Sequence, residues 1–342
     1  MKRLLFVTQQ IDPGHPALAA TVPMIAALAR RVDEVVVLAD GAVPDALPSN
    51  CRVRTFRAPT KAGRGLRFER ALAAELPGLR GGAVVAHMCP IYAVLAAPLV
   101  RPLKIPLVLW YTHWRPSRLL RAAERASTVV ASVDRRSFPL RSSKVRAIGH
   151  GIEVDEFACR DRDGDGSLRL LALGRYSPAK GLGVVVHAVA ATDARLTVHG
   201  PTLTSLEREH RATLDQLVDA LGVADRVRLE GPVPRTQVPE LFAEADLLVN
   251  NMRAGAPDKV VYEAAASCLP VVASNPVFDE LLGPELRFAR DDPDELAARL
   301  REFGGRDDAA RRELGRRLRE KVAAHHSADT WADGILGAAG LR

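Results

Sequence analysis

The stretch LRLLALGRYSPAKGLGVVVHAVA, residues Leu168–Ala190, decides the fold expected for this chain. An apolar run ends in Gly174, a turn carries Arg175 and Lys180, and a run with helical spacing follows. A strand, a short loop and a helix in this order are typical of a parallel α/β sheet, whose ligands bind at the carboxyl ends of the strands. Two cations at that edge, beside the N–H groups of a helix start, predict a phosphate or diphosphate site. Taken alone, the stretch fits solvated charges equally well.

Apolar runs alternate with helical ones along the whole chain, which predicts an α/β fold. Before residue 150 we expect a helix over 17–31 and strands over 3–8, 34–39, 52–56, 83–87, 107–112, 128–133 and 144–148. The charged segment Cys159–Ser167 interrupts the pattern, which then starts again. Further strands are expected over 168–173, 195–199, 226–229, 246–250 and 270–273, and helices over 292–303, 307–324 and 328–341. The sequence therefore predicts two α/β domains with a boundary near 149–167.

The composition of the 342 residues, 47% hydrophobic and 26% charged, is that of a soluble globular protein and excludes disordered and fibrous classes. The four cysteines have no paired spacing and are expected to be reduced thiols in a cytoplasmic protein. The apolar stretch Leu4–Val7 is too short for a signal peptide, and charges and prolines interrupt Ile91–Trp110. We therefore expect neither export nor a membrane-spanning helix.

Charge is distributed unevenly between the two halves of the chain. Residues 1–150 hold 23 lysines and arginines against 9 acidic residues, whereas residues 151–342 hold 25 against 32. The first half should attract anions such as a membrane surface, a phosphorylated acceptor or nucleic acid. In the cationic run Cys51–Arg70 we favour a surface for an anionic headgroup or acceptor over a solvated loop and helix face. Nucleic acid fits least, because this run has only two aromatic residues, Phe56 and Phe68, and lacks the recurring aromatics that base stacking needs.

A second segment, Asn250–Asn275, repeats the strand, loop and helix order of the opening stretch. Pro257 fits a first helical turn, so a helix is expected to begin there and to direct backbone N–H groups at the same crevice. These are the N–H groups of Asp258, Lys259, Val260 and Val261. Glu263 lies deeper in the helix and could accept hydrogen bonds from vicinal hydroxyls. The alternative for Glu263 is an ion pair with Lys259, four residues before it.

The motifs GRYSPAKG, VRLEGPVPRTQVPELFAEADLLVN and DKVVYEAAASCLPVVAS resemble the carboxy-terminal domain of family 4 glycosyltransferases. The segments LLFVTQQIDPGHP, LVLWYTHW and IGHGIEVDEF extend the resemblance over nearly the whole chain. The resemblance implies the GT-B fold, in which two Rossmann-like parallel-sheet domains face a central cleft. It implies an acceptor-side domain over 1–150, joined by the last helix over about 327–342. It also implies a nucleotide-sugar-binding domain over 151–326.

The resemblance also implies roles for single residues. Arg175 and Lys180, next to Gly174, would bind the donor diphosphate, and Glu263 the ribose hydroxyls. His113 would lie near the donor sugar, and Gly14 with His15 would lie on the acceptor side, although His15 could instead belong to a turn. The family commonly has a glutamate where this chain has Gly255, so Asp258, Lys259 or backbone groups would hold the sugar instead.

The function expected from these observations is retaining transfer of a sugar from a nucleoside-diphosphate donor to an acceptor hydroxyl. The acceptor could be anionic or lipid-linked, which would place the enzyme in the cytoplasm or at the inner face of the membrane. No metal or other cofactor is expected, because Arg175, Lys180 and a helix start already face the phosphates. The alternatives are a sugar-nucleotide epimerase and a non-catalytic nucleotide-sugar-binding protein. A dinucleotide-dependent oxidoreductase fits less well, since VTQQIDPGHP lacks the glycine fingerprint expected after the first strand.

Overall fold

The computed structural model describes residues 2–15, 18–43, 45–160 and 166–341, which form two compact units. Unit 1 comprises Met1–Glu153 and His325–Arg342, and unit 2 comprises Val154–Ala324. The divisions fall a few residues from the expected boundaries at positions 150 and 327. The expected domain boundary near 149–167 includes residues 161–165, which lie outside the described part of the chain.

The described part of unit 1 contains a parallel sheet with the strand order β3-β2-β1-β4-β5-β6-β7. Its side chains in β1 are buried in succession from Leu4 to Val7, as expected for a strand that is covered on both faces. Every strand predicted for this region is present; β4 has its predicted bounds, and the ends of the others differ by at most three residues. The strands are β1 (Arg3–Ile11), β2 (Glu34–Ala42), β3 (Cys51–Thr55), β4 (Ala83–His87), β5 (Leu107–Trp110), β6 (Val129–Ser132) and β7 (Val145–Ala147).

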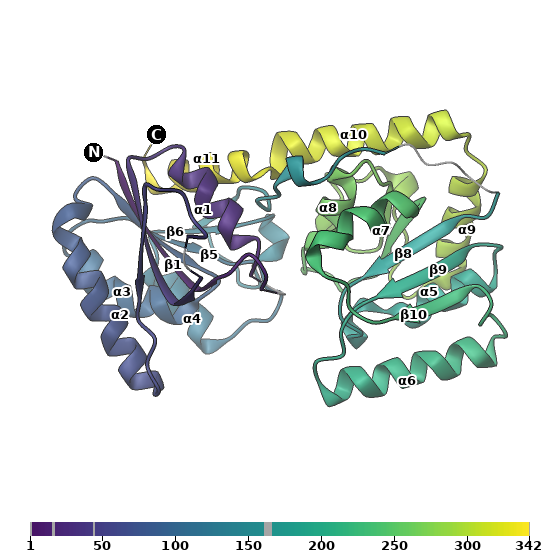
Figure 1. Cartoon of the computed structure of the whole chain (residues 1–342), viewed down its shortest axis with the longest axis horizontal. Helices are drawn as coiled ribbons and strands as arrows, with labels where there is room; N and C mark the ends of the chain where they lie inside the picture. Colours follow the sequence, from purple (N-terminus) through teal and green to yellow (C-terminus); the bar gives the residue numbers. More distant parts are fainter. Residues whose placement is uncertain (1, 16–17, 44, 161–165, 342) are drawn as a thin grey trace. The chain divides into compact units, whose positions relative to one another are not determined.

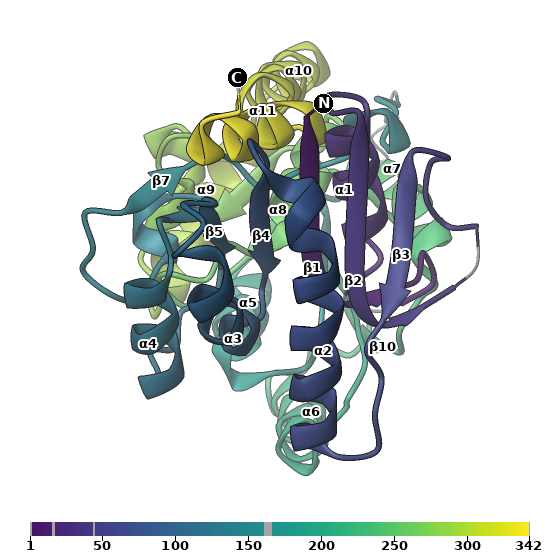
Figure 2. The ribbon, with the colours of Figure 1, turned by 90° about the vertical axis from the view of Figure 1, so that its left-hand side faces the viewer.

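Helices cover both faces of this sheet. Helices α2 (Lys61–Glu75), α3 (Pro90–Val100) and α4 (Arg118–Ala126) lie together on one face (Figure 2). Phe68, Tyr92 and Leu120 from these helices share one hydrophobic cluster with Leu5 and Leu109 of the strands. Helix α1 (Thr21–Ala29), shorter than the helix expected over 17–31, packs against α11 (Ala328–Ala339).

The return of the last helix to unit 1 has a clear physical basis. Trp331 of α11 is fully buried and meets Trp110 of β5 edge to face, with ring centroids 5.7 Å apart. Arg31, just after α1, forms ion pairs with Asp329 and Asp333 of α11 at 2.7 and 2.6 Å. Burial of a large aromatic side chain supplies the main stabilisation, because ion pairs this exposed contribute only about 0–1 kcal/mol each.

The described part of unit 2 contains a second parallel sheet, with the order β10-β9-β8-β11-β12 (Figure 1). Its strands are β8 (Arg169–Leu173), β9 (Arg195–His199), β10 (Val227–Glu230), β11 (Leu247–Asn250) and β12 (Val271–Ala273). Its helices are α5 (Leu182–Ala190), α6 (Ser205–Ala220), α7 (Val238–Glu244), α8 (Lys259–Ala266), α9 (Pro293–Gly304) and most of α10 (Asp308–His326). Because β8 and β11 are neighbours, the loops that follow them meet at one edge of the sheet.

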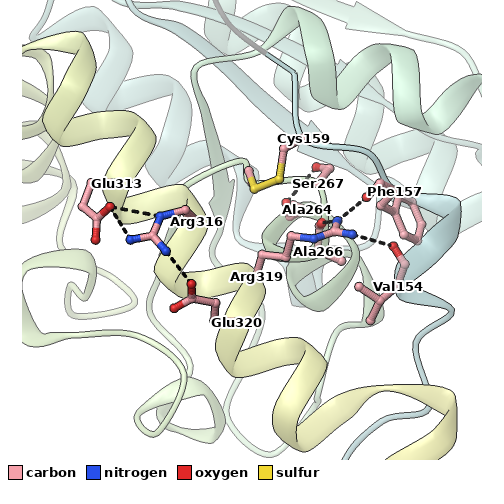
Figure 3. Close-up of a disulfide and its surroundings, with 11 residues drawn as sticks. Val154, Phe157, Cys159, Ala264, Ala266, Ser267, Glu313, Arg316, Arg319 and Glu320 are labelled. Carbon is pink, nitrogen blue, oxygen red and sulfur yellow. Dashed lines mark hydrogen bonds and ion pairs between the residues drawn. A yellow bond between two sulfur atoms is a disulfide. The ribbon is translucent and has the colours of Figure 1, made fainter.

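Arg319 connects helix α10 to α8 and to residues 154–160, the linker that follows the boundary between the units (Figure 3). Arg319 of α10 donates to the carbonyl oxygens of Phe157 and Ala266. Beside it, a disulfide joins Cys159 of the linker to Cys268, just after α8, with 5.0 Å between their Cα atoms. The prediction of four reduced thiols is therefore wrong for this pair, because the fold brings together two cysteines that are 109 positions apart. Cys51 and Cys89 carry free thiols.

Among the helices in the described ranges, none has both the length and the hydropathy that crossing a membrane would require.

Candidate functional site

The loop after β8 places Arg175 and Lys180 at the carboxyl edge of the unit 2 sheet. The chain leaves β8 at Gly174 with φ of +127°, a conformation that favours glycine. A Cβ atom at Gly174 would also lie 2.5 Å from the Lys180 Nζ, so the lysine side chain depends on this glycine for space. Gly200, just after β9, leaves space for the backbone of this loop, since a Cβ atom there would lie 2.0 Å from the Gly174 carbonyl oxygen.

Arg175 is directed to helix α6. Its side chain is 57% exposed, and its guanidinium lies 3.1 Å from Oε1 of the buried Glu207. The other oxygen of Glu207 accepts from the backbone N–H groups of Leu203 and Thr204, as part of a capping box at the start of α6. Glu207 therefore keeps two charge-assisted hydrogen bonds if Arg175 turns to a ligand.

Lys180 is far less exposed and points to helix α8. Its Nζ donates to the Leu173 carbonyl oxygen at 2.8 Å and to Asp258 Oδ2 at 2.5 Å. Asp258 Oδ2 also accepts from the side-chain amide of Asn250, the last residue of β11, at 2.8 Å. The segments 168–190 and 250–275 thus meet through an ion pair between Lys180 and Asp258. The Asp258 carboxylate contacts the lysine instead of being available to a donor sugar.

The first backbone N–H groups of a helix such as α8 have no carbonyl partner four residues earlier within the helix. Asp258 is the N-cap, yet its carboxylate makes no cap hydrogen bond with the described backbone of α8. The Val261 N–H donates to the Asp258 carbonyl oxygen at 3.1 Å. The first helical turn thus already uses the Val261 N–H, and its contact with the donor stays a prediction. The amides of Asp258, Lys259 and Val260 stay candidates for phosphate binding.

Glu263 lies 7% exposed in α8 and contacts two cations through the same oxygen. Lys259 Nζ and Arg235 Nη1 each lie 2.8 Å from Glu263 Oε1. Burial alone raises the pKa of Glu263, but Lys259 and Arg235 outweigh it and lower the pKa to about 2. The alternative interpretation of Glu263 as a partner of Lys259 is thus confirmed. No hydrogen bond or ion pair within the described chain uses Oε2, so this oxygen could accept from a ligand hydroxyl.

Arg235 was not among the predicted site residues. It follows β10 in a short 3₁₀ turn, Arg235–Gln237, and its second amino group reaches Glu156 of the linker at 2.8 Å. Like Arg175, it is an arginine just beyond the carboxyl end of a strand, so the rule that selected Arg175 could have selected it too. The same holds for Asn250 at the end of β11.

In unit 1, His113 follows β5, as the sequence predicts. Its imidazole Nδ1 accepts from the Arg115 backbone N–H at 3.1 Å, and its ring stacks on Trp114 with centroids 5.6 Å apart. The side chain is exposed, so a ligand could approach it. Its position near a donor sugar stays a prediction.

Gly14 and His15 form a turn after β1. The Gly14 N–H donates to Asp12 Oδ1 at 2.8 Å, and His15 Nδ1 accepts from the Leu18 N–H at 3.0 Å. The interpretation of His15 as a turn residue is thus confirmed, although the histidine also lines a cavity of about 580 Å³.

That cavity lies between the ends of β1 and β2 and the starts of α2 and α3. It is also lined by Gln10, Asp40, Lys61, Arg64 and Tyr92.

Within residues 2–15, 18–43, 45–160 and 166–341, no group of three or more His, Cys, Asp or Glu side chains could hold a metal ion. Metal-independent chemistry stays a prediction.

Comparison with known proteins connects this geometry to a family. Residues 167–303 match the family described as Glycosyl transferases group 1. These residues form a glycosyl transferases group 1 domain. The domain contains Arg175, Lys180, Arg235, Asp258 and Glu263, whereas Glu156, the second partner of Arg235, lies before it.

The chain is also similar to one glycosyltransferase in sequence and to two solved structures in fold. D-inositol 3-phosphate glycosyltransferase of Frankia alni is 33% identical over 124 residues, which are 33% of this chain and 29% of that protein. This chain therefore spans less than a third of that relative's length. Sucrose-phosphate synthase of Thermosynechococcus elongatus has a TM-score of 0.77 at 17% identity, over 98% of this chain and 97% of that one. Anabaena Alr3699/HepE in complex with UDP has a TM-score of 0.78 at 18% identity, over 98% and 99%.

These likenesses show that the fold is GT-B, with the glycosyl transferases group 1 domain as its second parallel-sheet unit. The expected fold is confirmed.

Proposed function

We propose that this protein is a retaining glycosyltransferase that moves a sugar from a nucleoside-diphosphate donor to an acceptor hydroxyl. The observation that carries the proposal is the cluster of Lys180, Asp258, Glu263 and Arg235 at the carboxyl edge of a glycosyl transferases group 1 domain. Alr3699/HepE, which shares the fold, binds UDP. Uracil is therefore the first base to test, with UDP as the ligand.

The chemistry follows from the charges of this cluster. Cleavage of the anomeric bond leaves an additional negative charge on the terminal phosphate of the departing diphosphate. Arg175, Lys180 and the first amides of α8 stabilise that charge, which is the main contribution that a protein can make to such a step. The acceptor hydroxyl attacks on the face that the diphosphate leaves and passes its proton to a departing phosphate oxygen. The anomeric configuration is thereby retained.

Donor specificity is testable by ligand-dependent stability. UDP at 100 times its Kd is expected to raise the free energy of unfolding by about 2.7 kcal/mol, because the ligand binds only the folded state. UDP, GDP, ADP and their glucose conjugates should be compared by thermal shift at equal concentrations. Nucleosides without phosphate serve as the control. Equal shifts with nucleosides and nucleoside diphosphates would contradict the proposed diphosphate site.

We also propose that the acceptor carries a phosphate group, bound in the unit 1 cavity. Lys61 and Arg64 of α2 line this cavity, Arg57 and Arg64 line a neighbouring one of about 500 Å³, and Asp40 is their acidic neighbour. Asp40 pairs with Arg64 at 3.0 Å, so Lys61 and Arg57 carry the excess charge. The named substrate of the Frankia relative is likewise a phosphorylated polyol.

Lys61→Ala is expected to raise KM for a phosphorylated acceptor by about tenfold, since one phosphate-binding cation is lost. D-inositol 3-phosphate, inositol and vesicles containing phosphatidylinositol are the acceptors to compare. Arg70→Ala, an exposed cation farther along α2, is the matched control and should leave KM unchanged. Preference for unphosphorylated inositol would exclude a phosphate-bearing acceptor.

A non-catalytic nucleotide-sugar-binding protein is the second candidate, favoured by Gly255 at the position where related transferases commonly have a glutamate. Such a protein would bind UDP-glucose but neither transfer nor hydrolyse it, which a donor-hydrolysis assay would reveal.

A further inference from the structure

The cations of the predicted donor site all have acidic partners in this structure. Arg175 pairs with Glu207, Lys180 with Asp258, and Lys259 and Arg235 with Glu263. A diphosphate must therefore compete with carboxylates that are already in place. The cost of that competition differs from one pair to the next, because the acids differ in what they retain when the cation turns away.

Glu207 retains two backbone N–H bonds without Arg175, and Glu263 keeps one cation if the other leaves. Asp258 has no comparable support. Without Lys180 its carboxylate would keep only the neutral amide of Asn250, at 2.8 Å. A largely buried carboxylate with one neutral partner is poorly stabilised. Lys180 is therefore the cation that the site releases least easily.

Lys180 can nevertheless reach a phosphate without leaving Asp258. An ammonium group has three N–H donors, and Lys180 uses two of them on Leu173 and Asp258. Gly174 leaves room for the lysine side chain at the loop, where the third N–H would meet a ligand. In that arrangement the phosphate and the Asp258 carboxylate share one ammonium and lie within a few Å of each other. Two negative groups so close repel strongly in a partly buried site.

We propose that Asp258 is an internal competitor of the diphosphate, which weakens donor binding and accelerates release of the nucleoside diphosphate product. This inference rests on the proposed function and adds a specificity and turnover role for one carboxylate. It also explains why Asp258 occupies the N-cap of α8 without capping it, since its side chain turns to Lys180. Release of product limits turnover in many enzymes, so a repelling carboxylate can be an advantage.

The test is Asp258→Asn, which keeps the size of the side chain and removes its charge. Isothermal titration with UDP and with inorganic pyrophosphate is expected to give at least about tenfold tighter binding to the variant than to the wild type. Stopped-flow displacement should show slower UDP dissociation by a similar factor. Higher salt should reduce the difference, because it screens charge repulsion. Asp215→Asn is the matched control: Asp215 pairs with Arg211 on the exposed face of α6 and should leave both affinities unchanged.

Each outcome has a distinct meaning. Tighter pyrophosphate binding without UDP binding would support the competitor role and point to another base. Equal or weaker binding of both ligands by a folded variant would overturn it, since Asp258 would then hold Lys180 in place for the ligand. If wild type and variant bind neither pyrophosphate nor any nucleoside diphosphate, the proposed function itself fails together with this inference. A thermal unfolding curve close to that of the wild type establishes that the variant is folded.

Discussion

Lys180→Ala is expected to lower kcat/KM for sugar transfer by about 100- to 1000-fold, the usual effect of removing one preorganised group that stabilises transition-state charge. The loss has two physical causes. The diphosphate loses its contact with an ammonium group. The Asp258 carboxylate loses the Lys180 Nζ, which lies 2.5 Å away, so its negative charge then repels the departing phosphates directly. Donor binding should weaken in parallel, measured as Kd for UDP alongside steady-state kinetics.

The control for this variant is Lys321→Ala. Lys321 of α10 also donates to backbone carbonyl oxygens, those of Glu280 and Leu281, and lies outside the predicted donor site. Its replacement should leave kcat/KM unchanged. The double variant Lys180→Ala with Asp258→Asn should recover part of the lost donor affinity, because it removes the repelling charge as well. Wild-type kcat/KM in the single variant would mean that Lys180 does not touch the diphosphate.

Much of the fold was predictable because buried parallel strands have a strong sequence signature. Runs such as VVVLA and PLVLWY are apolar on both faces, and each became a strand of the unit 1 sheet. Helix ends were predicted less well, since they depend on local bonding. The helix expected over 17–31 begins at Thr21 and ends at Ala29, and residues 16 and 17 lie outside the described chain.

The candidate site was only partly predictable, because sequence order shows which strand end a residue follows but not which partner its side chain selects. Lys180 and Asp258 were both expected at the sheet edge, but their mutual ion pair required the neighbouring positions of β8 and β11. Arg235 was not predicted, although it follows the carboxyl end of a strand as Arg175 does. The disulfide between Cys159 and Cys268 depends on the path of the linker across the end of α8, for which the cysteine spacing contains no signal.

Glu263→Gln is expected to lower the free energy of unfolding by about 3 kcal/mol at pH 7, because the charged form of this side chain is strongly favoured in the folded state. The pKa of Glu263 is about 2 when folded, below its ordinary value of 4.5, since Lys259 and Arg235 outweigh the effect of burial. Glutamine fills the same space but removes the charged partner of Lys259 and leaves Arg235 with Glu156 alone. Urea denaturation at pH 7 measures the difference directly.

The pH dependence identifies the cause of this loss. A carboxylate whose pKa is lowered by folding stabilises the protein fully above its unfolded pKa, and that stability disappears as pH falls towards its folded pKa. The wild type should therefore lose its advantage over Glu263→Gln between about pH 4.5 and pH 2. Glu209→Gln, which removes an exposed carboxylate from α6, should follow the wild-type curve at every pH. A constant difference between wild type and Glu263→Gln across this range would show that packing, rather than the charge on Glu263, stabilises α8.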